Sequence, residues 1–541
     1  MPDWFKYIAG EDFESFVQTP NLEQVVDSVL KRAAAGELLG LGHSLQHGHV
    51  EISQAEREGQ MHIIGAPGEG KSKFLEYLIH KDIDRLVADQ DKPREEWEGC
   101  GLCLIDPSAG ADTAYKVLRY CALKSFKKVF LVDAGKKYQF RKIAAINPFD
   151  CPESYSSRLE SDLNGALRVA FSAKEPGKQA YIESYLPAIF SVIYEFGGTL
   201  ADTFYFTSPP RVNLENDLKR SQMLDKALDS KNVIVRNNSL ELTEVYRTPQ
   251  NFSKEIGSTV RRLKAFFRGQ DDMRSIFGHR EGADFDKLIS DGWVILVNAS
   301  DERLDTIPSR LLAATIINRL ISAKERLWHS GNTRPYYLYV DEVSRFATDT
   351  ISDVLELKRK TGMRVVLAHQ NASQIRDKDI RDCIKKTTKI KAAFWVPDVD
   401  DRKENMRMLG YPDDSDIWEA LSVQPARQMA IKINKNEPVL ARVYDTPDIP
   451  DEALPKPFVE FIREILTSND VVKYYSSSEI EADYDARYKL SSSDFESARR
   501  GKASNGSKPR KNSVPKGGGK KSIPKGDEAA KNDGKREAYK F

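Results

Sequence analysis

The sequence is poor in cysteine, which argues against a fold held together by disulfide bonds or by cysteine-ligated zinc. Its five cysteines, in 541 residues, are too few and too irregularly spaced for a disulfide framework. Cys100 and Cys103 form a C-x-x-C pair, but no second pair follows, so we expect neither a zinc nor a redox site there. His43, His47 and His49 have no acidic or thiol residue beside them and are interpreted as part of a solvated loop.

Long apolar runs are also missing. No stretch reaches the roughly 18 to 20 consecutive apolar residues that a membrane-spanning helix needs. The N-terminal residues 1–6 lack the basic and apolar blocks of a secretory signal peptide. We therefore expect a cytoplasmic protein. Because single hydrophobic cores stop growing at about 250 to 300 residues, two or three domains are expected.

The small net charge of +1 hides an uneven distribution. Residues 499–541 carry 14 Lys or Arg and 4 Asp or Glu, a net charge of +10, whereas the other 498 residues carry 68 basic and 77 acidic side chains. From Ser476 onward, serine runs and then Gly, Lys and Pro repeats replace apolar periodicity, so this segment is expected to be disordered. Two interpretations stay open: a solubilising extension, or an electrostatic arm for nucleic acid, an anionic membrane or an acidic partner.

The strongest motif is a phosphate-binding loop. The apolar run at 61–64 leads into G-x-x-x-x-G-K-S and then into helical spacing, which is the strand, loop and helix order that this motif requires. Glycines let backbone amides turn toward a phosphate, the helix directs its positive end at the phosphate, and Lys71 adds a point charge. The residues predicted to bind ATP are Gly65, Ala66, Pro67, Gly68, Glu69, Gly70, Lys71 and Ser72.

A second apolar run, at 336–340, ends in two carboxylates, as a Walker B strand does. Asp341 is predicted to hold Mg²⁺ together with the hydroxyl of Ser72, and Glu342 to orient and deprotonate the attacking water. Carboxylates at strand ends also occur as solvated caps, but downstream of a P-loop the catalytic interpretation is favoured. The next predicted strand ends at Gln370, whose amide is placed to sense the γ-phosphate, while His369 is expected to be a packed neighbour.

Apolar periodicity divides the chain. Strands alternating with helices at 56–152 and 285–446 predict a parallel α/β nucleotide-binding domain. Helical spacing predicts an inserted all-α domain at 153–284, in which only Val233–Val235 is typical of a strand. The remaining predicted segments are a lead-in at 1–55 with a helix at 22–35 and a glycine-rich loop, a helical extension at 447–475, and a disordered basic tail at 476–541.

Several short motifs occur in the order found in one protein family. They are Asp106-Pro107, Asn147-Pro148-Phe149 before the helical insert, Gly257–Phe267 and Phe285–Leu288 at its exit, Asp341-Glu342, and Gly362 before the strand that ends in Gln370. Over about residues 55–445 the chain therefore resembles the type IV secretion coupling ATPases of the TraG/TraD type, within the RecA-like hexameric DNA pumps.

The resemblance implies a RecA-like motor that forms a ring, expected to be a hexamer, with ATP held between neighbouring subunits. DNA, either single-stranded or as a relaxase–DNA complex, would be handed to a type IV secretion channel. The all-α domain would lie at one mouth of the ring. Arg359 occupies the place of an Arg-rich segment of the family and is the candidate for an arginine that acts across the subunit interface, with Arg261 and Arg303 as alternatives.

Two departures from the family bear on function. Typical members begin with transmembrane helices, and this sequence has no run long and apolar enough to form one. The chain is therefore expected to be cytoplasmic, or held peripherally at the inner face of the cell membrane by a partner or by its basic tail. A Lys-Gly pair common after Asp106-Pro107 is replaced here by Ser108-Ala109-Gly110. Two alternatives stay open: a DNA-processing or defence motor that works with a nuclease, and a nucleotide-binding adaptor with little ATPase activity.

Overall fold

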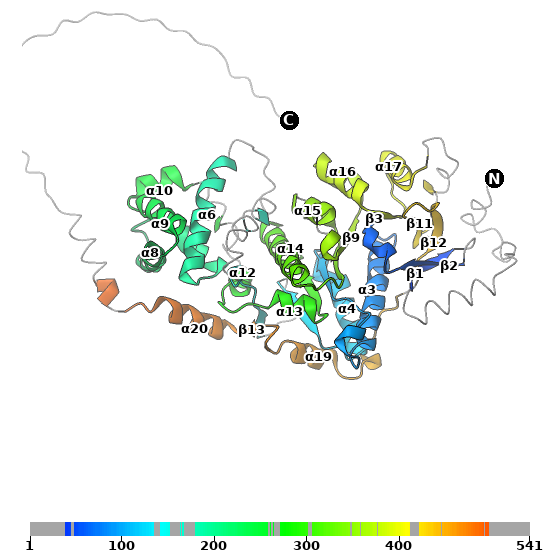
Figure 1. The fold of residues 1–541 in the computed structure, drawn as a ribbon, viewed down its shortest axis with the longest axis horizontal. Helices are drawn as coiled ribbons and strands as arrows, with labels where there is room; N and C mark the ends of the chain where they lie inside the picture. Colours follow the sequence, from blue (N-terminus) through cyan, green and yellow to red (C-terminus); the bar gives the residue numbers. More distant parts are fainter. Residues whose placement is uncertain are drawn as a thin grey trace, which may run out of the picture.

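In the computed structural model of the protein, the described residues form a large β-sheet covered by helices and a further group of helices (Figure 1). The residues that the structure describes are 38–44, 48–134, 141–151, 163, 165–166, 179–257, 260, 263–264, 271–300, 306–346, 349–357, 359–375, 377–411, 421–422, 424–444, 446–491 and 493–496. The predicted helix at 22–35 and residues 497–541 of the basic tail lie outside them.

Eleven strands form one sheet, in the order β2-β1-β12-β11-β10-β3-β9-β8-β4-β7-β5. From β10 to β5 the strands run parallel, and the others pair antiparallel. Their bounds are β1 Leu38–Ser44, β2 Gly48–Ser53, β3 Met61–Ile64, β4 Leu102–Asp106, β5 Val129–Asp133, β7 Val294–Asn298, β8 Tyr336–Val340, β9 Met363–His369, β10 Ile390–Ala393, β11 Gln428–Ile433 and β12 Val439–Arg442. The expected parallel α/β core is confirmed.

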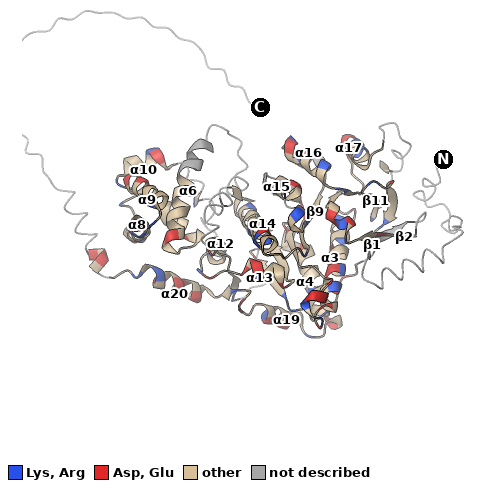
Figure 2. Ribbon diagram, viewed as in Figure 1, with Lys and Arg blue, Asp and Glu red and all other residues tan. Residues whose placement is uncertain are grey.

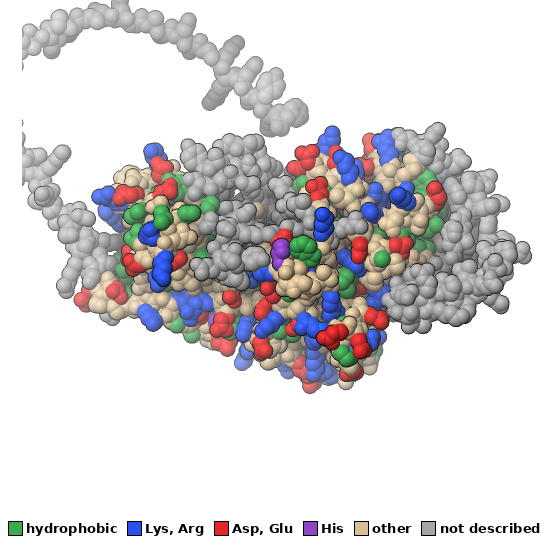
Figure 3. Space-filling view, viewed as in Figure 1, with side chains coloured by type: hydrophobic (Ala, Val, Ile, Leu, Met, Phe, Trp, Pro, Cys, Tyr) green, Lys and Arg blue, Asp and Glu red, His purple; other side chains and the backbone are tan. Residues whose placement is uncertain are grey.

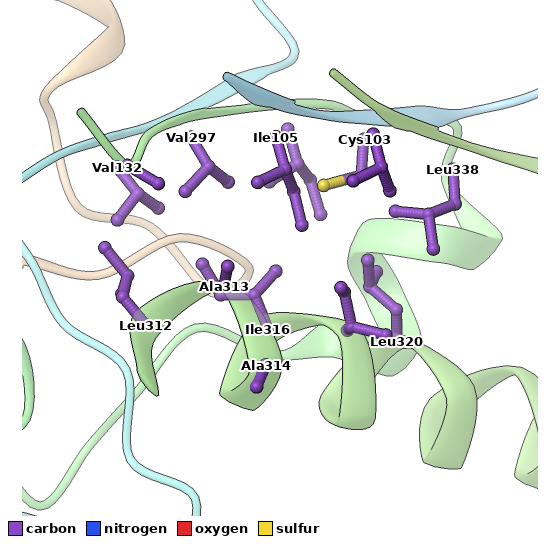
Figure 4. Packing of buried hydrophobic residues seen from close by; sticks show 14 of the residues in the cluster. Cys103, Ile105, Val132, Val297, Leu312, Ala313, Ala314, Ile316, Leu320 and Leu338 are labelled. Atoms are coloured by element: carbon purple, nitrogen blue, oxygen red, sulfur yellow. The ribbon is translucent and has the colours of Figure 1, made fainter. Parts of the chain in front are cut away.

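Helices bury the faces of the sheet. Helices α3 (Lys71–Ala88) and α4 (Asp112–Leu123) lie on one face, and α14 (Thr306–His329) packs on the other. Figure 4 shows apolar side chains of α14 directed at those of β4, β5, β7 and β8. These parallel strands are continuous apolar runs because both of their faces are covered. Beyond α14 lie α15 (Asp349–Leu357), α16 (Lys378–Thr387) and α17 (Val399–Leu409).

The described residues between β6 (Ile143–Ala144) and β7 contain helices and no strand, in agreement with the predicted all-α insertion. Three longer helices, α6 (Gln179–Phe196), α8 (Leu214–Leu228) and α9 (Val233–Val245), pack on one another. The shorter helices are α7 (Thr203–Phe206), between α6 and α8, and then α10 (Pro249–Glu255), α12 (Asp271–Ile276) and α13 (Phe285–Ser290), after α9.

The strand predicted at Val233–Val235 is wrong, since these residues begin α9. The side chain of Asn232 caps the helix by accepting a hydrogen bond from the backbone amide of Ile234 at 2.9 Å. The cap and the packing of α9 on α6 and α8 outweigh the local preference of β-branched residues for strands.

The boundary predicted at Ser476 also differs from the structure. Helix α19 (Phe458–Ile465) and strand β13 (Tyr474–Tyr475) are followed by helix α20 (Ser477–Tyr488), inside the segment expected to be disordered. Ser476 and Glu479 form a capping box that starts α20, and Tyr488 is buried at its end. In Figure 1 these elements run along the lower edge of the molecule, from beside α4 to the α6–α9 helices. We call residues 447–488 the C-terminal strap.

The N-terminal lead-in differs as well, because its predicted glycine-rich loop forms strand β1. Strand β1 pairs with β2, and His43 lies opposite Arg442 of β12, so residues 38–53 extend the main sheet. Within the described residues no group of three or more His, Cys, Asp or Glu side chains could hold a metal ion. No helix in the described part of the chain is long and apolar enough to span a membrane.

Candidate nucleotide-binding site

The ends of three neighbouring parallel strands form the candidate site. Strand β9 lies between β3 and β8, with Ile64 opposite His369 and Val340 opposite Leu367. The P-loop follows β3, Asp341 follows β8, and Gln370 follows β9. Because the carboxyl ends of parallel strands open at one edge of a sheet, this order brings the three predicted groups together.

The P-loop backbone has the form that phosphate binding requires. Gly68 and Gly70 have φ values of 84° and 111°, in a region that side chains disfavour, and Gly70 stands at the N-terminus of α3. A Cβ on Gly65 would lie 2.4 Å from Cβ of Phe394, so only glycine fits there. The amide of Ala66 donates to the carbonyl of Trp395 at 2.8 Å, which fixes the base of the loop. The loop and helix thus present amides and a positive helix end at one place.

Lys71 and Ser72 open helix α3 beside the loop. The Lys71 ammonium is buried and donates to the carbonyl of Ala66 at 3.3 Å. Burial lowers the pKa of Lys71, and the nearby Glu342, Asp341 and Glu69 carboxylates oppose that shift. The Ser72 hydroxyl lies 3.5 Å from Oδ2 of Asp341. This places a cation and a hydroxyl where the terminal phosphates and Mg²⁺ of a nucleotide would bind.

Asp341 is a buried carboxylate under electrostatic strain. Burial, then the neighbouring Asp106 and Glu342, raise its pKa to about 7, while Lys71 acts in the opposite direction. A carboxylate and a hydroxyl 3.5 Å apart are the oxygen ligands that Mg²⁺ prefers. A bound divalent cation would also relieve the repulsion among these acids. The side chains present therefore fit Mg²⁺, with Asp341 and Ser72 as its protein contacts.

Glu342 and Gln370 lie side by side. The Gln370 amide donates to Oε1 of Glu342 at 3.1 Å. Glu342 has a φ of 46°, an uncommon conformation for a residue with a side chain, and such strain clusters at functional sites. Gln374, which the sequence analysis did not single out, donates to Oε1 of Gln370 at 3.3 Å and accepts from the hydroxyl of Ser344 at 3.4 Å. Its position four residues after Gln370 is the signal that could have identified it.

Asp106, which the sequence marks only as part of a family motif, lies beside the site. It is fully buried, and its carboxylate accepts hydrogen bonds of 2.9 Å from the amides of Ser108 and Ala114. Burial raises its pKa. Ser108, which stands where the family often has lysine, thus helps to hold the carboxylate that raises the pKa of Asp341.

Arg359, the first of the candidate arginines, does not lie at this site. Arg359 begins a short helical turn, Arg359–Thr361, that directly precedes β9, so it lies at the edge of the sheet opposite the P-loop. A role for Arg359 would therefore require the site of a neighbouring copy. Arg261 and Arg303 lie outside the described residues.

Comparison with known proteins finds a match in three-dimensional structure and none in sequence. No family model and no curated protein matches the sequence. Among solved structures, the plasmid coupling protein TrwB in complex with the ATP analogue ADPNP aligns with a TM-score of 0.52 over 78% of this chain and 92% of its own, at 13% identity. The chain has the fold of the plasmid coupling protein TrwB. The predicted resemblance is confirmed at that level.

Two further structures are similar. TrwB in complex with the GTP analogue GDPNP has a TM-score of 0.50 and 12% identity, and the alignment covers 76% of this chain and 90% of that one. VirB4 of Thermoanaerobacter pseudethanolicus has a TM-score of 0.49 and 16% identity, with 76% and 97% covered.

Proposed function

We propose that this protein is an ATP-hydrolysing motor of the conjugative coupling class, which moves DNA or a nucleoprotein toward a type IV secretion channel. One observation carries the proposal: Lys71, Asp341, Glu342 and Gln370 converge at one edge of the sheet in a chain with the fold of TrwB. TrwB has been solved with ATP and GTP analogues, which supports a nucleoside triphosphate as the ligand.

The residues divide the chemistry among themselves. P-loop amides and Lys71 would bind the β- and γ-phosphates, and Ser72 and Asp341 would hold Mg²⁺, which when bound would neutralise charge on the phosphates. Glu342 accepts a proton from the attacking water, and Gln370, hydrogen-bonded to Glu342, orients that water against the γ-phosphate. Catalysis is then mostly positioning and electrostatic stabilisation.

The larger assembly in this proposal is a homo-oligomer, a hexameric ring in the family, with DNA as substrate and channel components as partners. Arg359 of one copy would reach the nucleotide of the next, which explains why it lies away from its own P-loop. The chain would act in the cytoplasm, with recruitment to the inner face of the membrane through a partner or the basic tail.

Two substitutions separate binding from hydrolysis. Lys71→Ala removes the buried ammonium and should weaken binding of a fluorescent ATP analogue by about 10- to 100-fold, because charge-assisted hydrogen bonds are lost. Glu342→Gln should retain binding and lower hydrolysis by about 100-fold or more. Binding is measured by fluorescence titration and hydrolysis by phosphate release.

Lys81→Ala is the matched control, because Lys81 lies ten residues further along α3 and its exposed ammonium pairs with Asp84 at 3.9 Å. It should change neither quantity by more than about twofold. Normal hydrolysis by Glu342→Gln would contradict the catalytic assignment.

A further inference from the structure

Two buried histidines lie directly behind the nucleotide site. His62, on β3, and His369, on β9, are 2% and 0% exposed. Their Nε2 atoms are 2.6 Å apart. The rings are stacked, with centroids 4.9 Å apart and planes 12° from parallel. The strand that leads into the P-loop is thus joined by side chains to the strand that leads into Gln370.

Hydrogen counting fixes the direction of this pair. Nδ1 of His369 lies 2.6 Å from the carbonyl oxygen of Asn371, which can only accept, so Nδ1 carries the hydrogen. Nε2 of neutral His369 is then an acceptor, and Nε2 of His62 donates to it. The result is a directed chain from His62 through His369 to the backbone of Asn371. Nδ1 of His62 is buried and has no hydrogen-bond partner in the described part of the chain.

Both rings are neutral, which the chain requires. Burial, then His369, Lys391 and Lys385, lower the pKa of His62 well below its ordinary value. Burial also lowers the pKa of His369 to about 4; the hydrogen bond to Asn371 opposes this shift, and Lys71 and Lys385 add to it. A second proton on His369 would turn its Nε2 from an acceptor into a donor and reverse the direction of the pair.

The chain of imidazoles ends at the parts that contact nucleotide. The carbonyl of His369 accepts from the amide of Gly65, the first glycine of the P-loop, at 3.3 Å. Gln370 is the next residue and donates to Glu342. The side chain of Asn371 accepts from the amide of Gln374 at 3.1 Å, so the turn after Gln370 is held from both sides.

We propose that His62 and His369 are positioning residues of the nucleotide site, whose shared hydrogen bond fixes the turn at 369–374 and thereby places Gln370 against the γ-phosphate. The inference rests on the proposed nucleotide-binding function and adds to it the residues that let the site distinguish a triphosphate from a diphosphate. His62 is buried on β3, and it acts through His369 and the turn.

The test measures equilibrium binding of ADPNP and of ADP, each with Mg²⁺, by full-length wild-type protein and variants. His62→Phe keeps a ring in the stack but removes the donor. We expect it to reduce the preference for ADPNP over ADP about five- to tenfold, with ADP affinity changed by less than twofold. His62→Gln, whose amide can donate to His369, should restore most of the preference. Asn371→Ala, at the half-buried turn, should reproduce the loss without altering the core.

A double substitution shows whether the effect passes through Gln370. In a Gln370→Ala background, His62→Phe should cause no further loss of preference, because the group that it positions is already absent. His80→Phe is the matched control: His80 is also buried, on α3, where its ring stacks on Tyr120 at 3.8 Å, and this variant should keep the wild-type preference.

Three outcomes would overturn the inference: an unchanged preference in His62→Phe and Asn371→Ala, an equal loss in the Gln370→Ala background, or a wild-type protein that binds ADPNP and ADP equally. Because the assay needs neither hydrolysis nor DNA, these outcomes are distinct from a failure of the proposed motor function.

Discussion

At the scale of single residues, the candidate site holds buried carboxylates that repel one another, which costs free energy in the folded state. Asp341 lies within a group of three carboxyl side chains, with Asp106 and Glu342, and the Lys71 ammonium and the backbone amide of Glu342 oppose the rise in its pKa. A structural strand end would not hold a buried acid whose pKa is raised to about 7. Such an arrangement is typical of sites in which a bound cation supplies the missing charge.

This cost gives a pH-dependent prediction for Asp341→Asn. The pKa of Asp341 is raised from 3.8 to about 7 on folding, so the folded state binds the proton more tightly than the unfolded state. Protonation of Asp341 therefore stabilises the folded state fully below pH 4, and this stabilisation is lost as the pH rises toward 7. In protein free of nucleotide and metal, the Asp341→Asn variant should therefore unfold at the same temperature as the wild type near pH 4 and at a higher temperature at pH 8. At pH 8 its free energy of unfolding should exceed that of the wild type by about 1–3 kcal/mol.

Thermal unfolding followed by circular dichroism from pH 4 to 8 measures this difference. Asp91→Asn, at an exposed position, is the control and should leave the unfolding temperature within experimental error at every pH. A difference between Asp341→Asn and the wild type that does not grow with pH would contradict the account of a strained carboxylate.

At the scale of elements, the sequence predicts the parts with strong local patterns. The strands before the P-loop and before Asp341 are continuous apolar runs, and the glycines between 65 and 70 permit one loop geometry, so these parts are predictable without tertiary context. The adjacency of Gln370 and Glu342 follows only from the order of strands, which pairs β8 with β9. The sequence motif alone does not contain that pairing.

The elements that were missed depend on distant partners. Strand β1 contains glycines that favour a loop, and it exists because β2 and β12 pair with it. Helix α20 is rich in polar residues and has little apolar periodicity. Its Arg487 and Tyr488 side chains are held by hydrogen bonds to Gly278 and Asp202, which lie more than 200 positions earlier in the chain. Local propensity cannot predict an element whose stability comes from such contacts.

Arg487 supplies the test of the C-terminal strap. Its guanidinium pairs with Asp202 in the helical part of the molecule, and the two side chains are 2% and 0% exposed. Asp202 also accepts from the hydroxyl of Tyr488 at 2.7 Å. Arg487→Leu leaves the buried Asp202 charge without its cation and should cost about 3 kcal/mol or more in the attachment of α20.

Hydrogen exchange measures this attachment peptide by peptide. In Arg487→Leu, protection should fall in α20 and around Asp202, while the P-loop peptides remain as in the wild type. The control is Arg247→Leu, which removes an exposed pair with Glu244 in the same helical part and should change protection little. Equal protection of α20 in Arg487→Leu and the wild type would show that the ion pair does not hold the strap.

At the scale of the whole molecule, the face of the chain drawn in Figure 3 does not gather basic side chains into one surface for DNA. Basic and acidic side chains are interspersed along the ribbon and on the visible face (Figures 2 and 3). A nucleic-acid interface on one chain would gather basic side chains into a patch or stripe. We therefore expect the DNA-directed part of the proposal to depend on assembly, in which copies of the chain would combine their surfaces and Arg359 would meet a neighbouring nucleotide.

The central claim is that the chain is a DNA-stimulated ring ATPase, and steady-state hydrolysis measured against protein concentration tests it most directly. The assay compares wild type with Glu342→Gln, without DNA and with single- or double-stranded DNA. The account predicts hydrolysis that rises cooperatively with protein concentration, increases with DNA and disappears in Glu342→Gln. Hydrolysis that is absent, or proportional to concentration and indifferent to DNA, would contradict it and favour a nucleotide-binding adaptor.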